Sequence, residues 1–342
     1  MDTTSHIVIG LGLGALAQMD PVVTGSSLSQ AVILGTVIGS NAPDADCVYK
    51  LRGKGSYFRN HRAWSHSLPA LPLWGLAVSG IIHPFFDDSS FLHLFMWTFL
   101  AVILHVVFDL FNVYGTQAAR PISSKWISFD SIPLVDLFIL GLHAIGFALI
   151  PFFEPGIIFA FIYLIILLHI VYRTFYARRI KKHLGLYFSE AIRIKLIPRP
   201  DLLTWDFLID NEDQFIFGTY TARRIKIEHK FPKQIDNPGL IEKSKKEQKV
   251  SDFLSSTEFA YPFVKKTKSG FFVMWRDLRF RESKTYFPYH AIMYITYDYK
   301  FKSTYIDKIY SLKNYKKVLR ELERNCTTEN EQSTKKLKHV SA

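Results

Sequence analysis

Long apolar segments dominate the first half of this chain and restrict it to a helical membrane fold. The segments of about one bilayer span are Leu68–Phe86, Phe91–Val113, Ile132–Phe152 and Gly156–Tyr172. A helix needs ~20 predominantly apolar residues to cross a bilayer, and each of these segments is close to that length. Two shorter, Gly-rich apolar segments precede them, Ile7–Gln18 and Leu28–Ser40. We therefore expect an α-helical membrane domain of four to six helices, in which the two short segments form a hairpin against their neighbours.

Glycines in the two short segments favour close packing of helices. Gly10, Gly12 and Gly14 have spacing similar to a dinucleotide-binding loop, but no predicted β-strand precedes them. Gly35 and Gly39 have the spacing at which small residues let helix backbones approach. We therefore predict helix contacts at these positions in preference to a nucleotide site.

The two halves of the chain differ in charge. Residues 1–172 contain seven Lys and Arg against ten Asp and Glu, a net charge of −3, whereas residues 173–342 contain 35 against 20, a net charge of +15. An apolar half joined to a basic half indicates a membrane domain followed by a soluble domain that faces anionic lipid or another polyanion. We expect the membrane domain over residues 1–175 and a basic α+β domain, largely β, with a polar tail over 176–342.

The distribution of Lys and Arg between loops predicts the orientation. Counted for six helices, one set of loops (20–27, 87–90 and 153–155) contains no Lys or Arg, and the opposite set (41–67 and 114–131) contains all seven of this half. The positive-inside rule then places both termini and the C-terminal domain in the cytoplasm. We expect a multi-pass protein of the cell membrane.

Alternating and aromatic patterns predict β-structure in the second half. Residues 202–210 and 214–220 flank an Asn-Glu-Asp turn and predict a β-hairpin. Further strand is predicted in Phe253–Lys266, Gly270–Phe280 and Tyr289–Tyr299. Other segments predict a basic helix at the membrane surface, a charged linker, and a helical tail ending in disorder; these are Tyr176–Tyr187, Lys233–Ser251 and the residues from Asn314.

Ionisable residues inside or beside the apolar segments are the candidates for chemistry. His105 and Asp109 are spaced i, i+4, so they share one face of a predicted span. An intramembrane ionisable pair is a functional hypothesis, and the alternative is a hydrogen bond that ties two helices together. Asp44 and Asp46 follow Pro43 in a turn just past a helix end. The alternative for this turn is a solvated or capping aspartate.

A second histidine-rich stretch lies in the same set of loops. His61 and His66 bracket Arg62, and Ser65 and Ser67 offer hydroxyls. The alternative is a basic loop that touches lipid headgroups. His6, at the start of the first apolar segment, is placed by the topology on the same side of the membrane, although it can equally be a polar N-terminal residue.

The combination of these residues at one membrane face predicts a metal site. The candidate ligands are His6, Asp44, Asp46, His61, His66, His105 and Asp109. Imidazole and carboxylate ligands suit Zn²⁺, Mn²⁺ or Fe²⁺, and several carboxylates favour more than one ion, as in phosphoester cleavage. We expect a divalent metal, zinc in preference, as one or two ions that activate water.

Other residues complete the predicted site. Asp46, Arg62 and Ser67 are the candidate catalytic residues, because Arg62 can form a bidentate contact with a phosphate. Arg120 is a second phosphate candidate, and the alternative for either arginine is anchoring of the loop at the membrane. Asp130 and Asp136 flank the next helix and are expected to support the ligands or the fold.

The chain resembles a known family at these residues. The runs PDADCV, HRAWSHS and HVVFDLFNVYGTQAARPIS, followed by Asp130 and Asp136, resemble the bacterial YdjM-type family of membrane-bound metal-dependent hydrolases. The basic, β-containing second half is most similar to the YfhP-like branch of that family. The resemblance covers about residues 1–175 and implies a hydrolase.

A more distant similarity concerns the order of the ligands. Zinc phospholipases C and P1-type nucleases take ligands in the order His, Asp, His and then His-x-x-x-Asp/Glu, and the candidates here follow a similar order from His6 to Asp109. Those enzymes also use a free N-terminal amine, which here precedes His6 by five residues, and a second His-x-x-x-Asp/Glu helix, of which the sequence offers no convincing example. These departures favour one or two ions over a three-metal cluster.

Three functions remain open at this point. The first is a metal-dependent hydrolase acting on a phosphoester or lipid-like substrate at the cytoplasmic face. The second is a membrane-anchored negative regulator of transcription, in which the basic half, with aromatics interleaved over Phe271–Lys300, contacts DNA or a partner protein. The third is a transporter that uses the His–Asp pair as an ion relay, but its candidate residues gather at one face and do not cross the midplane.

Overall fold

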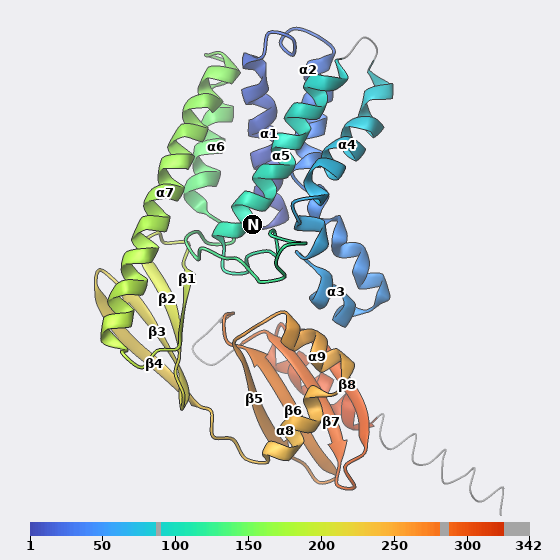
Figure 1. Ribbon diagram of the computed structural model, residues 1–342, viewed down its shortest axis with the longest axis vertical. Helices are drawn as coiled ribbons and strands as arrows, with labels where there is room; N and C mark the ends of the chain where they lie inside the picture. The colour runs from blue at the N-terminus through green and yellow to red at the C-terminus, as the bar shows by residue number, and fades with distance from the viewer. Residues whose placement is uncertain (87–89, 281–286, 325–342) are drawn as a thin grey trace, which may run out of the picture. The chain divides into compact units, whose positions relative to one another are not determined.

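Two compact units make up the protein in a computed structural model that describes residues 1–86, 90–280 and 287–324 (Figure 1). The first, called here the helical unit, comprises Met1–Cys47, Asn60–Asn211 and Phe217–Ile227. The second, called here the C-terminal unit, comprises Val48–Arg59, Glu212–Ile216 and the described residues from Glu228 onward. Each unit is described by itself.

The helical unit is a bundle in which helices far apart in sequence lie side by side (Figure 1). Its main helices are α1 (Thr3–Leu16), α2 (Leu28–Gly39), α4 (Ala70–Ile82), α5 (Phe91–Phe111), α6 (Leu137–Leu149) and α7 (Pro155–Tyr187). Short 3₁₀ helices connect or extend them: η1 (Ala17–Met19), η2 (Ala42–Arg52), η3 (Trp64–His66) and η4 (His83–Phe85). The predicted hairpin of short helices is confirmed as α1 and α2, which pack against each other and against α5.

Fewer helices are long enough to span a membrane than the sequence predicted. Within the described residues, α5 (21 residues) and α7 (33 residues) are long and apolar enough, and a third candidate arises if Lys54–His66 and Ala70–Phe85, bent by 84°, count as one span. The predicted spans 68–86 and 132–152 contain helices of only 13 residues, α4 and α6, because turns and short 3₁₀ segments occupy the rest.

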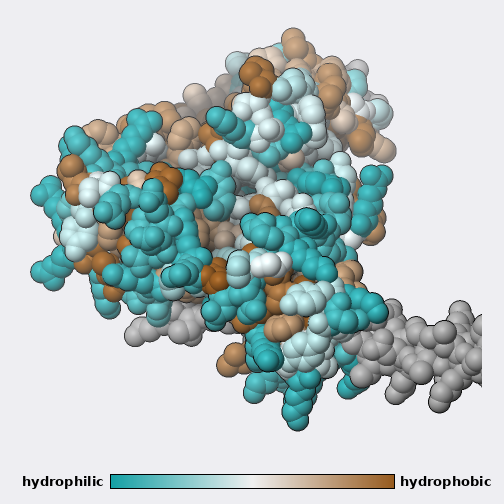
Figure 2. Space-filling view, turned by 60° about the horizontal axis from the view of Figure 1, so that its bottom comes forward, coloured by the Kyte–Doolittle hydropathy of each residue, from teal (hydrophilic) through white to brown (hydrophobic). Residues whose placement is uncertain are grey.

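Large apolar side chains are exposed on the bundle, as lipid contact requires. On α7, Phe161 is 63% and Leu168 is 60% exposed, and on α4 Ile81 is 69% exposed. Such a surface is unusual for a protein surrounded only by water. The face shown in Figure 2 is instead covered mainly by hydrophilic side chains.

Close helix packing at the glycines is confirmed. A Cβ atom built on Gly10 would lie 2.4 Å from Ser40 Oγ and 2.7 Å from the carbonyl oxygen of Thr36, so α1 and α2 meet backbone to backbone. A Cβ on Gly35 would lie 2.3 Å from Thr98 Oγ1 on α5. Because these glycines have no side chain, α2 can pack closely against α1 on one side and α5 on the other.

Gly10→Ala is expected to destabilise the protein by about 1–3 kcal/mol, because the added methyl group must push α1 away from the α2 backbone. Chemical denaturation in detergent micelles measures this loss. Gly141→Ala on α6 is the matched control, since a Cβ there meets nothing within 4 Å. That control should instead gain about 0.5–1 kcal/mol from the better helix propensity of alanine. Equal effects of the two substitutions would contradict the packing argument.

Helix α7 leads into the first antiparallel sheet. The predicted helix at 176–187 is confirmed, and these residues continue α7 without a break to Tyr187. The strands are β1 (Arg193–Pro198), β2 (Thr204–Asp210), β3 (Gln214–Thr221) and β4 (Arg224–Pro232), in that order in the sheet. The predicted hairpin is confirmed as β2 and β3. Buried Arg173 ties α7 to β2, since its guanidinium lies 3.8 Å from the ring centre of Trp205 and donates to the carbonyl of Ser131.

The C-terminal unit contains a second antiparallel sheet with helices on both faces. Its strands are β5 (Ala260–Lys266), β6 (Gly270–Asp277), β7 (Tyr289–Thr296) and β8 (Phe301–Lys308), in that order. One face packs on α8 (Pro238–Lys245) and α9 (Gln248–Ser255), and the other packs on a helix over 312–324. The predicted linker over 233–251 is therefore wrong, and 253–255 belong to α9 instead of a strand. The expected disorder after residue 324 lies outside the described residues.

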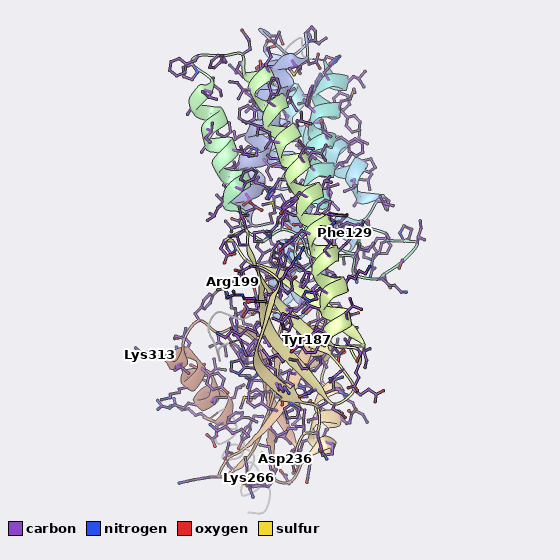
Figure 3. The ribbon with its side chains drawn as sticks, turned by 90° about the vertical axis from the view of Figure 1, so that its left-hand side faces the viewer. Phe129, Tyr187, Arg199, Asp236, Lys266 and Lys313 are labelled. Carbon is purple, nitrogen blue, oxygen red and sulfur yellow. The ribbon has the colours of Figure 1, made fainter. Side chains whose placement is uncertain are left out.

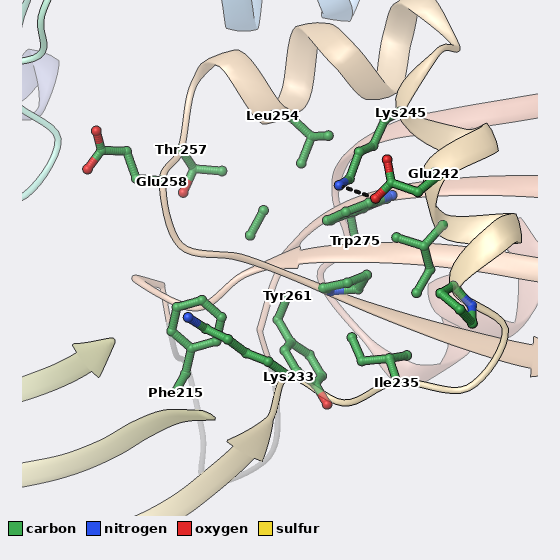
Figure 4. Close-up of a pocket in the computed structure, with 14 residues that line it drawn as sticks. Phe215, Lys233, Ile235, Glu242, Lys245, Leu254, Thr257, Glu258, Tyr261 and Trp275 are labelled. Carbon is green, nitrogen blue, oxygen red and sulfur yellow. Dashed lines mark hydrogen bonds and ion pairs between the residues drawn. The ribbon is translucent and has the colours of Figure 1, made fainter. Parts of the chain in front are cut away.

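A pocket of about 430 Å³ lies beside α8 in the C-terminal unit (Figure 4). Trp275 lines it, together with the lysines Lys233 and Lys245 and the carboxylates Glu242 and Glu258. Lys245 is paired with Glu242 at 2.6 Å. Because the two positive and two negative side chains balance, this pocket offers no excess charge for a polyanion such as DNA.

Candidate metal centre

Four residues from three separate segments converge inside the helical unit. Asp44 lies in η2, just past the end of α2; His66 ends η3; and His105 and Asp109 lie one turn apart on α5. The ligand atoms of all four lie within 4.8 Å of one another. His66, His105 and Asp109 are fully buried, and the Asp44 side chain is 22% exposed.

Hydrogen bonds at the outer nitrogens fix the tautomers of both imidazoles. His105 Nδ1 lies 2.6 Å from the carbonyl oxygen of Ser40, so Nδ1 carries the proton and donates. His66 Nδ1 lies 2.9 Å from Ser65 Oγ, whose own hydrogen is donated to Asp46 Oδ2 at 2.7 Å. Ser65 must therefore accept from His66 Nδ1. Both Nε2 atoms are left with lone pairs, which is the arrangement of metal-ligating histidines.

The four inward-facing atoms are all electron-pair donors. The Nε2 atoms of His66 and His105 lie only 3.2 Å apart. Asp44 Oδ1 and Asp109 Oδ2 are buried without a hydrogen-bond donor, and each lies 3.4–3.6 Å from both Nε2 atoms. Four converging lone pairs repel unless a cation lies between them. The residues therefore fit a divalent metal, and two imidazoles with two carboxylates are a typical ligand set for zinc, manganese or iron.

The outer oxygen of Asp109 is held by three donors. Asp109 Oδ1 accepts from the Met1 amino group, from Asn112 Nδ2 at 3.0 Å, and pairs with Arg62 Nη2 at 3.2 Å. These contacts turn the other oxygen, Oδ2, towards His66 and His105. Asp109 is thus oriented by its surroundings in the way that supporting residues orient metal ligands.

The position of the Met1 amino group differs from the sequence-based expectation. Its separation from His6 in sequence suggested that the amine is too distant from the site to take part. In the structure the amine is buried, lies 3.1 Å from His6 Nε2 and contacts Asp109. His6 itself stacks on His105 with 3.8 Å between ring centres and lies 3.5 Å from Asp109 Oδ1. His6 therefore lies beside the four-residue cluster and is not a member of it.

Asp44 also belongs to a second cluster, with Asp46 and His61. Asp46 Oδ1 lies 2.7 Å from His61 Nδ1, and its Oδ2 accepts from the backbone N–H of Arg62 and from Ser65. Burial raises the pKa of Asp46, but hydrogen bonds from His61 and Ser65 outweigh it and lower that pKa. An ionised Asp46 positions His61 directly and His66 through Ser65.

Arg62 stands in a strained backbone conformation, with φ 60°, which costs on the order of 1 kcal/mol for a residue other than glycine. Its guanidinium donates to Asn112 Oδ1 and to the carbonyl of Met1, both at 3.2 Å, in addition to its ion pair with Asp109. Arg62 therefore balances the charge of Asp109. Arg120 donates to Gln117 and lies over the ring of Trp64.

The other predicted residues, Ser67, Asp130 and Asp136, belong to neither cluster. Each has a partner elsewhere among the described residues. The Ser67 hydroxyl donates to the carbonyl of Trp64 at 2.6 Å. Asp130 pairs with Lys181 at 2.9 Å and Lys195 at 2.7 Å. Asp136 caps α6 and lies 3.2 Å from His169.

Sequence reasoning missed Asn112 and discounted the Met1 amino group. Asn112 follows Asp109 by three residues, so helical spacing could have identified it. The amino group was set aside because it precedes His6 by five residues, and only the path of the backbone shows that it reaches the site.

These features define a class: a helical protein with two or three candidate membrane spans in the part that the structure describes and a possible metal site, followed by an α/β region with two antiparallel sheets. The profile of the YdjM inner membrane protein family matches residues 1–180, and that of the YfhP C-terminal alpha/beta plait domain matches residues 239–319. The chain belongs to the YdjM inner membrane protein family, as its sequence motifs indicated.

A full-length relative supports the assignment. The Bacillus subtilis (strain 168) protein described as "Uncharacterized protein YfhP" is 34% identical over 324 residues, which cover 94% of this chain and 99% of that protein. No solved structure matches the chain.

Proposed function

We propose that the protein is a membrane-bound metal-dependent hydrolase. The observation that carries this proposal is the convergence of two imidazole nitrogens and two carboxylate oxygens within 4.8 Å of one another. Neither carboxylate oxygen has a hydrogen-bond donor. Asp44, His66, His105 and Asp109 would hold one ion, and Asp44, Asp46 and His61 would hold a second. When bound, a divalent ion, zinc in preference, supplies Lewis acidity that activates water at neutral pH.

The protein's own residues prepare the site for this chemistry. Arg62 and the Met1 amino group compensate the charge of Asp109 and fix its direction. Ser40 and Ser65 hold the two imidazoles in the tautomer that directs Nε2 inward. The partly exposed members are Asp44 at 22% and His61 at 26%, so a substrate reaches the site from their side.

We propose a phosphoester or lipid-like substrate at the cytoplasmic face. The two clusters share Asp44, so two ions held there would lie close together. Two neighbouring ions can stabilise the attacking and the leaving oxygen in phosphoester cleavage. The cytoplasmic orientation is supported by the Lys and Arg residues, which gather in the loops that also carry Asp44, His61 and His66. A site within these loops is open to substrates in the adjoining membrane leaflet.

His105→Ala and His66→Ala are expected to remove most of the bound metal, because each substitution deletes one of four ligands. Elemental analysis of the full chain purified in detergent measures this loss. His93→Ala is the matched control, since His93 lies on the same helix but pairs with Asp20, 3.7 Å away. It should keep the wild-type metal content.

Two results would contradict the proposal. Metal that stays bound in both cluster variants would remove the basis for a metal site. Metal-loaded protein that hydrolyses neither nitrophenyl phosphate esters nor phospholipid in vesicles would contradict the hydrolase, while leaving a metal-binding membrane protein.

A further inference from the structure

An apolar groove of about 540 Å³ lies between α5 and α7 of the helical unit. Leu104, Phe108 and Phe111 line it from α5, and Phe129 from the following loop. Figure 3 shows Phe129 beside α7. The volume is within the range of ligand pockets, ~300–1,000 Å³. These α5 residues alternate with His105 and Asp109, so the groove and the metal cluster occupy different faces of α5.

The groove follows one stripe of α7 for the length of a lipid chain. Its lining on α7 recurs every three or four residues from Tyr163 through Ile166, Ile170 and Thr174 to Arg178. Fifteen residues of helix rise about 22 Å, more than half of the ~30 Å hydrocarbon core. An acyl chain in one leaflet therefore has room to lie along the whole stripe.

The lining changes from apolar to polar at one end only. Tyr163, at the other end, uses its hydroxyl to donate to the carbonyl of Ile9. Thr174 Oγ1 is buried without a hydrogen-bond partner, and Arg178, one turn further, is exposed. Nearby Arg173 donates to the carbonyl of Ser131, and Lys181 forms an ion pair with Asp130. Arg178, in contrast, forms no ion pair with any residue in 1–86, 90–280 and 287–324. An apolar groove that ends at an unpaired guanidinium is complementary to an acyl chain with an anionic headgroup.

We propose that this groove binds one anionic phospholipid. One acyl chain lies between α5 and α7, the phosphate contacts Arg178, and the Thr174 hydroxyl donates to an ester oxygen of the same lipid. The lipid is a resident ligand, and its binding does not depend on the metal centre.

Native mass spectrometry of the full chain tests this proposal after incubation with phosphatidylglycerol or phosphatidylcholine of identical acyl chains. We expect the wild type to retain one phosphatidylglycerol in preference to phosphatidylcholine. Arg178→Ala should weaken phosphatidylglycerol retention about fivefold and phosphatidylcholine retention by less, because the choline cation already neutralises the phosphate of the second lipid. Arg179→Ala is the matched control, because Arg179 lies over Phe175 and does not line the groove.

A second variant tests the apolar part of the groove. Val107→Trp fills the groove from the α5 side and should abolish retention of both lipids. If its melting temperature shows that this variant is unfolded, Leu167→Trp, which fills the groove from α7, is tested in its place. Equal retention of the two lipids by the wild type, wild-type retention by Arg178→Ala, or wild-type retention by the filled groove would each overturn the proposal. Metal content is measured separately, so failure here leaves the hydrolase proposal untouched.

Discussion

Replacing Asp109 by alanine is expected to lower the free energy of unfolding by about 3–5 kcal/mol, the cost of breaking a buried ion pair from one side. The Asp109 side chain is fully buried, and its Oδ1 compensates both the Met1 amino group and Arg62. Without the carboxylate, two buried positive groups remain with no counter-charge. The variant should also lose bound metal, because Oδ2 is one of the converging ligand atoms.

Chemical denaturation in detergent micelles measures this effect, and elemental analysis follows the metal. Asp298→Ala is the matched control, because Asp298 forms an ion pair with Lys300 whose side chains are 56% and 74% exposed. An exposed pair contributes little, so this control should unfold at nearly the same denaturant concentration as the wild type. A loss below about 1 kcal/mol in Asp109→Ala would show that Arg62 and the amine do not depend on this carboxylate.

The sequence predicted strands at the centre of each sheet and missed most of those at the edges. Strands β2, β3, β6 and β7 show apolar alternation or aromatic runs because both of their neighbours are strands and their side chains are largely buried. Strands β1, β4 and β8 are edge strands and carry Lys and Arg, which weakens the alternation. Charged edges are a common defence against pairing with other chains. Edge strands are therefore harder to predict from hydropathy.

Two short helices, α8 and α9, were mistaken for a linker because of their charge. Pro238 stands in the first turn of α8, where its missing N–H is not needed, and Glu247 caps α9 by accepting from Val250 N. Leu240, Ile241 and Ser244 share the buried side of α8. Helix-start signals were thus present, but the lysines between them dominated the composition.

The convergence of the four residues of the candidate metal centre could be predicted because it rests on spacing and topology. His105 and Asp109 share a helix face, and the loops with Asp44 and His66 were placed on the same side as that end of α5. The sequence could not show which carboxylates already accept hydrogen bonds. Asp46 has donors on both oxygens, whereas Asp44 Oδ1 has none. Asp44 Oδ1 is therefore available to an ion as it stands, whereas Asp46 would have to give up a hydrogen bond to hold the second ion.

Asp44→Asn is expected to stabilise the metal-free protein by about 1 kcal/mol and to weaken metal binding. Asp44 Oδ1 lies 3.6 Å from the Nε2 lone pairs of His66 and His105 and has no donor of its own. An amide in this place offers an N–H to one of these nitrogens, and so replaces a repulsive contact by a hydrogen bond. The same change removes a negative ligand from the site.

Thermal unfolding in detergent measures both effects, first after chelation and then with added zinc. The order of stability should invert: the variant is more stable without metal, and the wild type is more stable once zinc reaches 100 times its dissociation constant, which adds about 2.7 kcal/mol. Asp46→Asn is the control, because its amide would face existing donors and should destabilise the metal-free protein by about 1–3 kcal/mol. If metal-free Asp44→Asn were less stable than the wild type, the four inward atoms would not repel one another, and the structural case for a cation between them would fail.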